Sequence, residues 1–543
     1  MNIKQKITEY VKDNSKNFIL SLLFLLILFL YAWLSDDAYI TFRTVDNFVN
    51  GYGLTWNISE RVQSFTHPLW TLVLSVFYLP TGEIYYTSLI LSMVISLTAV
   101  LLIIYKLSDS YYNTLLIVLI LILSKSFIDY STSGLENPLT HLLIAVFFIV
   151  YFNYKDGDRK LLFLSLVASL VALNRLDAIL ICIPILISNY LQSKKIKGLL
   201  IIILGFVPLI IWEMFSLLYY GFLFTNTAYA KLNTGIAELQ LIGQGINYFL
   251  YSIYFDPITP FIILIGLIYP IFLRDRKLLL ISAGIFLYAV YIIYIGGDFM
   301  GGRFLSAPLL CSTIIISTIR VKSKKILALQ VTFVIMIGML ASNPPSFPFL
   351  HTSAGAKIFK TLKININQHH GIVDERDIYF KNTGLINNIN QRQLLKFCMI
   401  DSALMVRKSS KSVVVQGVIG MFGYYCGPKI HIIDTLALSD PLLSKLPCDR
   451  RALPFDDFHP FDSRRWRIGH FKRSVPVGYI QTIQTGANQI ADPDLRKYYD
   501  KLHVLIKGDV GDINRLKEIW NFNIGRYNYL LKNYAVNLRR KII

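Results

Sequence analysis

Two adjacent carboxylates, Asp36 and Asp37, come shortly after the apolar run FILSLLFLLILFLYAW at residues 18–33. A carboxylate within hydrogen-bond reach of a hydroxyl can take its proton while the oxygen attacks another centre. Adjacent residues of a regular element point in different directions, and two close carboxylates raise the pKa of one of them. We therefore expect Asp36, with Asp37 as its partner, to act as a general base, while the second carboxylate orients a neighbouring group or binds a divalent cation. The alternative for Asp37 is a helix cap for residues 38–49.

The composition places this acidic pair in a membrane protein. Of the 543 residues, 54% are hydrophobic and 16% are charged, whereas about 25% are charged in an average soluble domain. Long apolar runs recur from residue 18 to about residue 342, which predicts a polytopic α-helical membrane module over residues 1–342. Residues 343–543 are polar and contain no spanning run, so we expect one soluble domain there.

Eleven apolar segments are expected to span the membrane as helices. They lie near residues 17–34, 87–105, 113–130, 138–153, 160–173, 178–192, 197–217, 259–273, 278–295, 304–320 and 325–342. Two further apolar segments, near 60–80 and 236–255, are expected to lie along the membrane interface.

The charges of the short loops predict the orientation of the chain. The N-terminus and the loops NYKDGDRK, QSKKIKG, LRDRKL and IRVKSKK are basic, and they alternate with loops rich in acidic, glycine and aromatic residues. Basic flanks stay on the cytoplasmic side. We therefore expect a bacterial inner-membrane protein with its N-terminus in the cytoplasm and residues 343–543 in the periplasm or another extracytoplasmic space.

This topology places several acidic loops on the outer side together. Besides Asp36 and Asp37, the loops with Glu136, Asp177 and Asp298 face outward. Ionisable groups at the membrane are costly to desolvate, so a cluster of them indicates function. The alternative for each single loop is that the acid merely solvates it.

The C-terminal region is basic and is expected to be an α/β domain. Residues 351–543 hold 30 Lys and Arg against 16 Asp and Glu, a charge that suits an anionic lipid surface or glycan rather than nucleic acid on that side. Residues 412–427 and 429–436 have the pattern of β-branched strands around glycine turns. Segments 492–508 and 512–536 have a helical pattern. Outside the cytoplasm Cys426 and Cys448 could pair.

Several motifs, in order along the chain, resemble C-type fold (GT-C) glycosyltransferases, in particular the mycobacterial arabinofuranosyltransferase B family. They are DDAYITFR, NGYGLTWN, ERVQSFTHPLW, SGLEN, NRLDAIL, YYGFLFTNTAYAKL and GGDFMGGRFLSAP, followed by GMFGYYCGPKIHIIDTLALSDPLL and RIGHFKRSVPVGYI. Two positions depart from the family pattern. His67 stands where Asn is usual and Leu176 where Pro is usual, which leaves the donor sugar and the acceptor open.

The resemblance implies an inverting transferase that takes a sugar from a polyprenyl-phosphate donor on the outer face of the membrane. The leaving phosphate is an anion and needs cations or hydrogen-bond donors aimed at it. Candidate contacts to the donor phosphate or sugar are Arg43, His67, Glu136, Arg175, Asp177, Asn226, Lys231, Asp298 and Arg303. Arg43 could instead pair with Asp36 or Asp46, His67 could be a packing residue, and Glu136 could cap the following helix.

The resemblance implies arabinofuranose as the sugar, although related enzymes use mannose, glucose or aminoarabinose. The acceptor is expected to be an envelope polysaccharide, a lipopolysaccharide or a pilin-like surface protein. No cofactor is expected beyond the open alternative of a divalent cation. A transporter or flippase of lipid-linked sugars and a non-catalytic scaffold of envelope assembly are the alternative functions. Against a transporter, the hydropathy shows no internal repeat.

Overall fold

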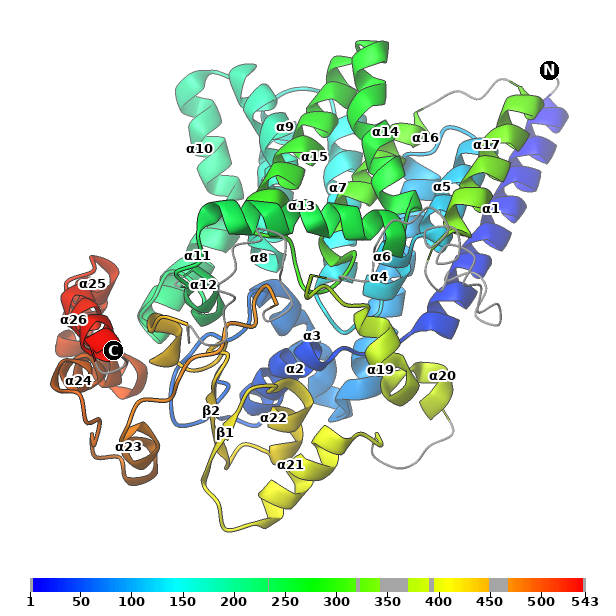
Figure 1. Cartoon of the computed structure of the whole chain (residues 1–543). Coiled ribbons are helices and arrows are strands. Elements are labelled where there is room, and N and C mark those ends of the chain that lie inside the picture. Colours follow the sequence, from blue (N-terminus) through cyan, green and yellow to red (C-terminus); the bar gives the residue numbers. More distant parts are fainter. Residues whose placement is uncertain are drawn as a thin grey trace. The chain divides into compact units, whose positions relative to one another are not determined.

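The structure is a computed structural model that describes residues 3–232, 234–318, 323–341, 370–389, 395–448 and 467–540, with side chains between residues 15 and 535. These residues are mostly helical (Figure 1). They form two compact units. Unit 1 consists of Met1–Ser35, Tyr85–Pro208 and Glu238–Arg392, and unit 2 consists of Asp36–Ile84, Leu209–Ala237 and Gln393–Ile543.

Unit 1 contains the most apolar helices of the chain. Its elements are α1 (Ile3–Tyr31), α4 (Ile84–Lys106), α5 (Tyr111–Leu123), α6 (Lys125–Tyr130), α7 (Asn137–Asn153), α8 (Asp158–Asn174), η1 (Leu176–Ala178), α9 (Ile179–Leu191), α10 (Lys195–Gly205), α13 (Glu238–Phe255), α14 (Ile258–Leu273), α15 (Arg276–Tyr294), η2 (Arg303–Leu305), α16 (Ser306–Ser317), α17 (Lys324–Gly338), α19 (Glu375–Thr383) and α20 (Leu385–Asn388).

Most long helices of unit 1 pack side by side, and α13 lies across them (Figure 1). Helix α8 packs against α7, α9 and α10, while α15 packs against α9, α13, α14 and α16. Small residues permit the closest approaches. A Cβ atom on Gly284 of α15 would overlap the backbone of Ile181 in α9, and one on Gly266 of α14 would overlap Ser312 in α16. Close approaches at small residues are typical of helices packed in membranes.

Each of the eleven segments expected to span is helical in the described part of the chain. By length and composition α4 and α15 are each able to cross a membrane, and three bent helix pairs pass the same test together. The number eleven therefore stays a prediction. The segment near 113–130 differs from the expectation of one continuous helix, because it breaks at Ser124 into α5 and α6. The Ser124 hydroxyl accepts a hydrogen bond from the Phe127 amide and starts a new helix there.

Unit 2 is assembled from three separate stretches of the chain. Its elements are α2 (Asp36–Val49), α3 (Pro68–Thr81), α11 (Val207–Tyr220), which begins two residues before the unit, α12 (Asn226–Leu232), α21 (Cys398–Lys408), β1 (Val413–Gln416), α22 (Gly420–Cys426), β2 (His431–Asp434), η3 (Leu443–Lys445), α23 (Tyr479–Thr485), α24 (Pro493–Lys507), α25 (Ile513–Asn523) and α26 (Asn528–Arg540).

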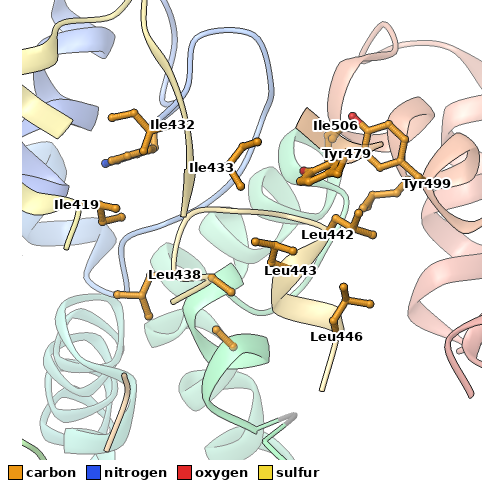
Figure 2. Packing of buried hydrophobic residues seen from close by; sticks show 14 of the residues in the cluster. Ile419, Ile432, Ile433, Leu438, Leu442, Leu443, Leu446, Tyr479, Tyr499 and Ile506 are labelled. Carbon is orange, nitrogen blue, oxygen red and sulfur yellow. The ribbon is translucent and has the colours of Figure 1, made fainter. Parts of the chain in front are cut away.

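The core of unit 2 joins these three stretches. Ile40 and Trp56 from the first and Ala230 from the second belong to the same buried cluster as Ile432 and Leu443 from the third. Figure 2 shows the part of this cluster around β2 and η3, with Tyr479, Tyr499 and Ile506 beside Leu442. The described residues of the C-terminal region 343–543, called the tail below, share this core with residues near 40 and 230. The tail therefore does not pack only with itself.

The secondary structure of the tail agrees with the sequence pattern in most places. Strands β1 and β2 pair in parallel, with Val413 opposite His431 and Gln416 opposite Asp434. Helices α24, α25 and α26 cover the segments with a helical pattern. Residues 420–426 are different, because they form helix α22 instead of continuing as a strand. Residues 343–369, 390–394, 449–466 and 541–543 of the tail lie outside the described residues.

All five cysteines are free thiols in this structure. Cys426 and Cys448, which could have paired, are both buried, and the thiol of Cys426 donates a weak hydrogen bond to the Ala403 carbonyl oxygen at 3.6 Å. Cys182 and Cys311 are buried among helices, as expected of packing residues, and Cys398 is exposed.

Candidate active site

The acidic pair forms the first turn of α2. This helix has 14 residues and carries Asp36, Asp37, Arg43 and Asp46, so it is too short and too charged to cross a membrane by itself. Negative side chains in a first helical turn interact favourably with the positive end of the helix dipole. The two carboxylates therefore stabilise the start of α2 at this point of the sequence.

Asp36 is buried, with 3% of its surface exposed, and is bonded to helix α22. Its carboxylate accepts hydrogen bonds from the backbone N–H of Met421 at 2.8 Å and of Gly420 at 3.2 Å. Burial raises the pKa of Asp36 to about 7, the Met421 and Gly420 amides lower it, and the charge of Asp37 raises it further. The approach is so close that a Cβ atom on Gly420 would overlap the Asp36 backbone.

Asp37 is half-buried and is therefore the more accessible carboxylate of the pair. Successive residues of a helix point about 100° apart, so α2 cannot bury both side chains against α22. The chain uses Asp36 to attach α22 to α2, and this attachment fixes the direction in which Asp37 projects.

Arg43 lies in the core of unit 2. Its guanidinium donates to the carbonyl oxygens of Trp56, Gly423 and Ile430 at 2.8, 2.6 and 2.8 Å, and it lies over the Trp56 ring at 4.3 Å. Only 2% of its surface is exposed. These contacts join three parts of unit 2, and none of them is the ion pair with Asp36 that the sequence left open. Arg43 could contact a phosphate only if the residues that bury its guanidinium moved away.

His67 and Asn226 are also held by the protein. The Nε2 atom of His67 lies 2.7 Å from the Thr41 hydroxyl. The Asn226 amide donates to the carbonyl oxygens of Ala437, Leu438 and Asp440 at 3.0–3.1 Å, and its oxygen accepts from Ser444 at 2.8 Å. Asn226 thereby fixes α12 to the tail.

Lys231 is exposed in the last turn of α12. Its side chain passes close to Gly469, where an added Cβ atom would lie 3.0 Å from the Lys231 Cε atom. Among the cationic candidates of unit 2, Lys231 is thus open to solvent, whereas Arg43 is buried.

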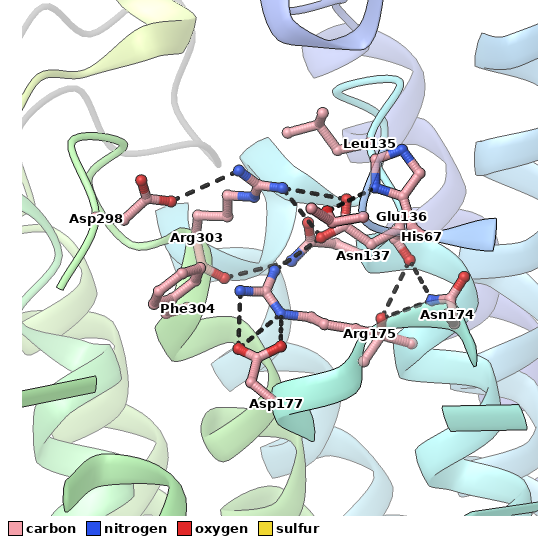
Figure 3. Close-up of polar contacts among 12 residues, drawn as sticks. His67, Leu135, Glu136, Asn137, Asn174, Arg175, Asp177, Asp298, Arg303 and Phe304 are labelled. Carbon is pink, nitrogen blue, oxygen red and sulfur yellow. Dashed lines mark hydrogen bonds and ion pairs between the residues drawn. The ribbon is translucent and has the colours of Figure 1, made fainter. Parts of the chain in front are cut away.

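The remaining candidates meet in unit 1 as one ionic network (Figure 3). Glu136 stands at its centre. Its carboxylate accepts from Arg175 at 2.8 Å and from Arg303 at 3.0 and 3.1 Å. Asp177 accepts from Arg175 at 3.0–3.2 Å, and Asp298 lies 3.6 Å from the Arg303 guanidinium. The three loops that carry these five residues are far apart in the sequence but lie together in the structure.

Neutral groups hold this network in place. The Phe304 ring lies 4.2 Å below the Arg175 guanidinium, and the Tyr288 hydroxyl donates to Asp177 at 3.0 Å. The Asn174 amide donates to the Glu136 carbonyl oxygen at 3.0 Å. Gly302, with φ of 80°, makes the left-handed turn that starts η2 and presents Arg303.

Three carboxylates therefore face two guanidinium groups in a buried setting. Glu136 has 2% of its surface exposed, and both arginines already donate to it. An incoming phosphate has to displace a carboxylate from one guanidinium, or share it. The network can serve as a pre-positioned pair of forked donors for an anion, since arginine matches phosphate geometry.

The eleven predicted residues fall into two sets. Asp36, Asp37, Arg43, His67, Asn226 and Lys231 belong to unit 2, and Glu136, Arg175, Asp177, Asp298 and Arg303 belong to unit 1. Within the described residues, no three His, Cys, Asp or Glu side chains are placed to hold a metal ion.

The sequence did not predict two further buried ionisable features, the Lys125 ion pairs and Glu60. Lys125 lies 3.0 Å from both Asp129 and Asp374 in unit 1. In unit 2, burial raises the pKa of Glu60 to about 7. The spacing of Lys125 and Asp129, four residues apart in an apolar segment, is a signal that could have revealed the first group.

No protein-family model matches the chain. Over 219 residues, 37% of its length, the chain is 29% identical to the terminal beta-(1->2)-arabinofuranosyltransferase of Mycobacterium tuberculosis (strain ATCC 25618 / H37Rv). The chain spans 35% of the length of that relative. By sequence, this chain is thus similar to part of a protein named as an arabinofuranosyltransferase.

Proposed function

We propose that the chain is an integral-membrane glycosyltransferase that moves a sugar from a polyprenyl-phosphate donor to an acceptor hydroxyl. The observation that carries the proposal is the carboxylate pair Asp36–Asp37, which follows an apolar helix and has one buried and one accessible member. The similarity to a protein named as an arabinofuranosyltransferase supports this class of reaction.

In the proposed reaction Asp37 is the general base and Asp36 is a positioning residue. The acceptor hydroxyl loses its proton to Asp37 as its oxygen attacks the anomeric carbon. The bond between that carbon and the phosphate oxygen breaks, and its electron pair leaves with the phosphate. A single displacement of this kind inverts the anomeric configuration. The two backbone hydrogen bonds of Asp36 favour this division of roles, because they leave its carboxylate committed to α22.

The network around Glu136 is proposed to bind the leaving phosphate or the sugar. Arg175 and Arg303 supply the positive charge that a departing phosphate needs. Glu136, Asp177 and Asp298 hold both guanidinium groups in place, and they also supply acceptors for sugar hydroxyls. Lys231 is proposed as an additional cationic contact, since it is exposed.

The location and the substrates are part of the same proposal. The basic loops support a cytoplasmic N-terminus, a membrane module within residues 1–342 and a tail outside the cytoplasm in a bacterial inner membrane. Arabinofuranose is the proposed sugar, by similarity to the mycobacterial relative. An envelope glycan or a surface glycoprotein is the proposed acceptor.

Transfer from synthetic polyprenyl-phosphate arabinofuranose, measured with the purified full chain in detergent, tests the proposal. We expect sugar to appear on an acceptor glycan and polyprenyl phosphate to be released in equal amount. Polyprenyl-phosphate mannose and glucose are the matched alternative donors. Failure to transfer from any of the three, with a chain that is folded and binds the donor, would contradict the proposed reaction.

A further inference from the structure

Helix α25 presents an apolar stripe on its outer face. Ile513, Leu516, Trp520 and Ile524 are 79%, 41%, 68% and 57% exposed. They follow one another at intervals of three or four residues and therefore lie on one side of the helix and its end. The opposite side of the helix is buried, with Ile519 in the core of unit 2. A large exposed apolar stripe of this kind marks an interaction surface.

Helix α25 is bonded to the end of helix α11 through the buried Arg515 and the exposed Asn523. The guanidinium of Arg515 donates to the carbonyl oxygens of Leu218 and Tyr219 at 2.5 and 2.8 Å. The Asn523 amide donates to the Gly221 carbonyl oxygen at 2.9 Å. Arg515 thereby satisfies two carbonyl groups that the C-terminus of α11 leaves without an intrahelical partner, and Asn523 bonds the residue that follows the helix. Helix α25 is therefore fixed at the point where α11 ends.

Helix α11 itself has the character of a membrane helix. Together with α10 it forms a bent pair that is long and apolar enough to cross a membrane. Its side chains Ile211, Met214 and Leu218 are more than two-fifths exposed, and no water-facing polar stripe covers them in the sequence IIWEMFSLLYY. The end of such a helix lies at the boundary between hydrocarbon and headgroups, so α25 is held at that depth.

We propose that the apolar stripe of α25 inserts into the headgroup region of the membrane that α11 enters. A tryptophan flanked by aliphatic side chains is the composition expected of an interfacial helix. Lys517 and Arg526 are exposed next to Leu516 and Ile524, and the tail carries a large excess of Lys and Arg over Asp and Glu. These charges suit anionic headgroups. The occupant is thus a lipid surface, with anionic lipids favoured.

Quenching by brominated lipids measures the depth of Trp520 directly. The full chain is reconstituted in nanodiscs of phosphatidylcholine with phosphatidylglycerol, with and without bromine atoms near the glycerol end of the acyl chains. Because Trp520 is one of six tryptophans, its signal is the difference between the wild type and Trp520→Phe. We expect this difference signal to be quenched by bromine and to shift to longer wavelength when Ile513→Glu is introduced.

Asn514→Glu is the matched control, since it places the same charge next to the stripe but about 100° around the helix. It should leave the quenching of Trp520 unchanged. If brominated lipid does not quench the Trp520 signal, or if Ile513→Glu and Asn514→Glu behave alike, the stripe does not contact lipid. Circular dichroism and gel filtration of each variant show whether it is folded, and Trp520→Phe alone provides the depth measurement if Ile513→Glu fails to fold.

Discussion

Replacing Arg303 by Ala removes one of the two guanidinium groups that share the Glu136 carboxylate. Glu136 and Asp177 then share Arg175 alone, and Asp298 loses the cation 3.6 Å away. Removing one partner of a buried ion pair costs about 3–5 kcal/mol, because it leaves an uncompensated buried charge. We expect Arg303→Ala to be destabilised by about this amount and to bind the donor more weakly.

A second substitution separates the structural cost from the loss of binding. Arg303→Ala combined with Asp298→Asn removes one positive and one negative charge and restores the balance of the network. The two residues are close, so their effects should be non-additive by about 0.5–3 kcal/mol. We expect the double variant to regain stability over Arg303→Ala, while its affinity for the donor phosphate stays low.

Two measurements on the full chain in detergent decide between these effects. Thermal unfolding followed by fluorescence reports stability, and titration with a short-chain polyprenyl-phosphate sugar reports donor affinity. Asp298→Asn alone is the control for the loss of the acid. If the double variant recovers donor affinity together with stability, Arg303 only supports the fold. If Arg303→Ala unfolds at the wild-type temperature, the network does not stabilise unit 1 as argued.

Four other outcomes are expected. Asp37→Asn should lower turnover by about 10²–10⁴, the usual contribution of a positioned general base, without changing the unfolding temperature. Near-normal turnover would show that Asp37 is not the base. Gly420→Ala should lower turnover with little effect on donor affinity, since the added Cβ overlaps Asp36; an unchanged rate would show that this contact does not position the pair. Glu60 has a pKa raised by burial to about 7, so the folded state holds a proton that the unfolded state releases between about pH 4.5 and 7. The free energy of unfolding should fall as pH rises through that window, and Glu60→Gln should be more stable than the wild type at pH 8 by about 1–3 kcal/mol. Unfolding at pH 5 and pH 8 measures this. If the stability of the wild type and of Glu60→Gln changes equally between the two pH values, the argument is contradicted. Cys398, the exposed thiol, should react with an impermeant maleimide in intact cells, and labelling only after lysis would place the tail inside.

Hydrophobic periodicity carried most of the information on secondary structure. In the described residues the eleven apolar segments are helical, since an α-helix satisfies the backbone hydrogen bonds within one segment in an apolar setting. The strand pattern at Val413–Gln416 and His431–Asp434 was also readable, because β-branched residues dominate both. The break at Ser124 was not predicted, although Ser124 is a local cap for Phe127; its hydroxyl is also bonded to Asp256 and Thr259, more than 130 residues further along the chain.

The types of the candidate residues were predictable, but their roles were not. Arg43 and Asn226 look like ligand contacts in the sequence, yet their donors are taken up by carbonyl groups from segments more than 200 residues away. No local pattern reveals such partners. The same holds for Glu136, whose two arginines come from positions 39 and 167 residues further along the chain. Sequence spacing identifies polar residues in loops, but only tertiary packing shows which of them are already satisfied.

The adjacency of Asp36 and Asp37 now has a geometric reason. If both acids lay on the same face of α2, they would be three or four residues apart, and both would be buried against α22 or both exposed. One residue apart, they point in directions about 100° apart, so α22 can bind one and leave the other half-buried. Burial makes the Asp36 carboxylate costly to ionise and raises its pKa to about 7. This geometry supports the proposal that Asp36 positions the pair and leaves Asp37 accessible to an acceptor.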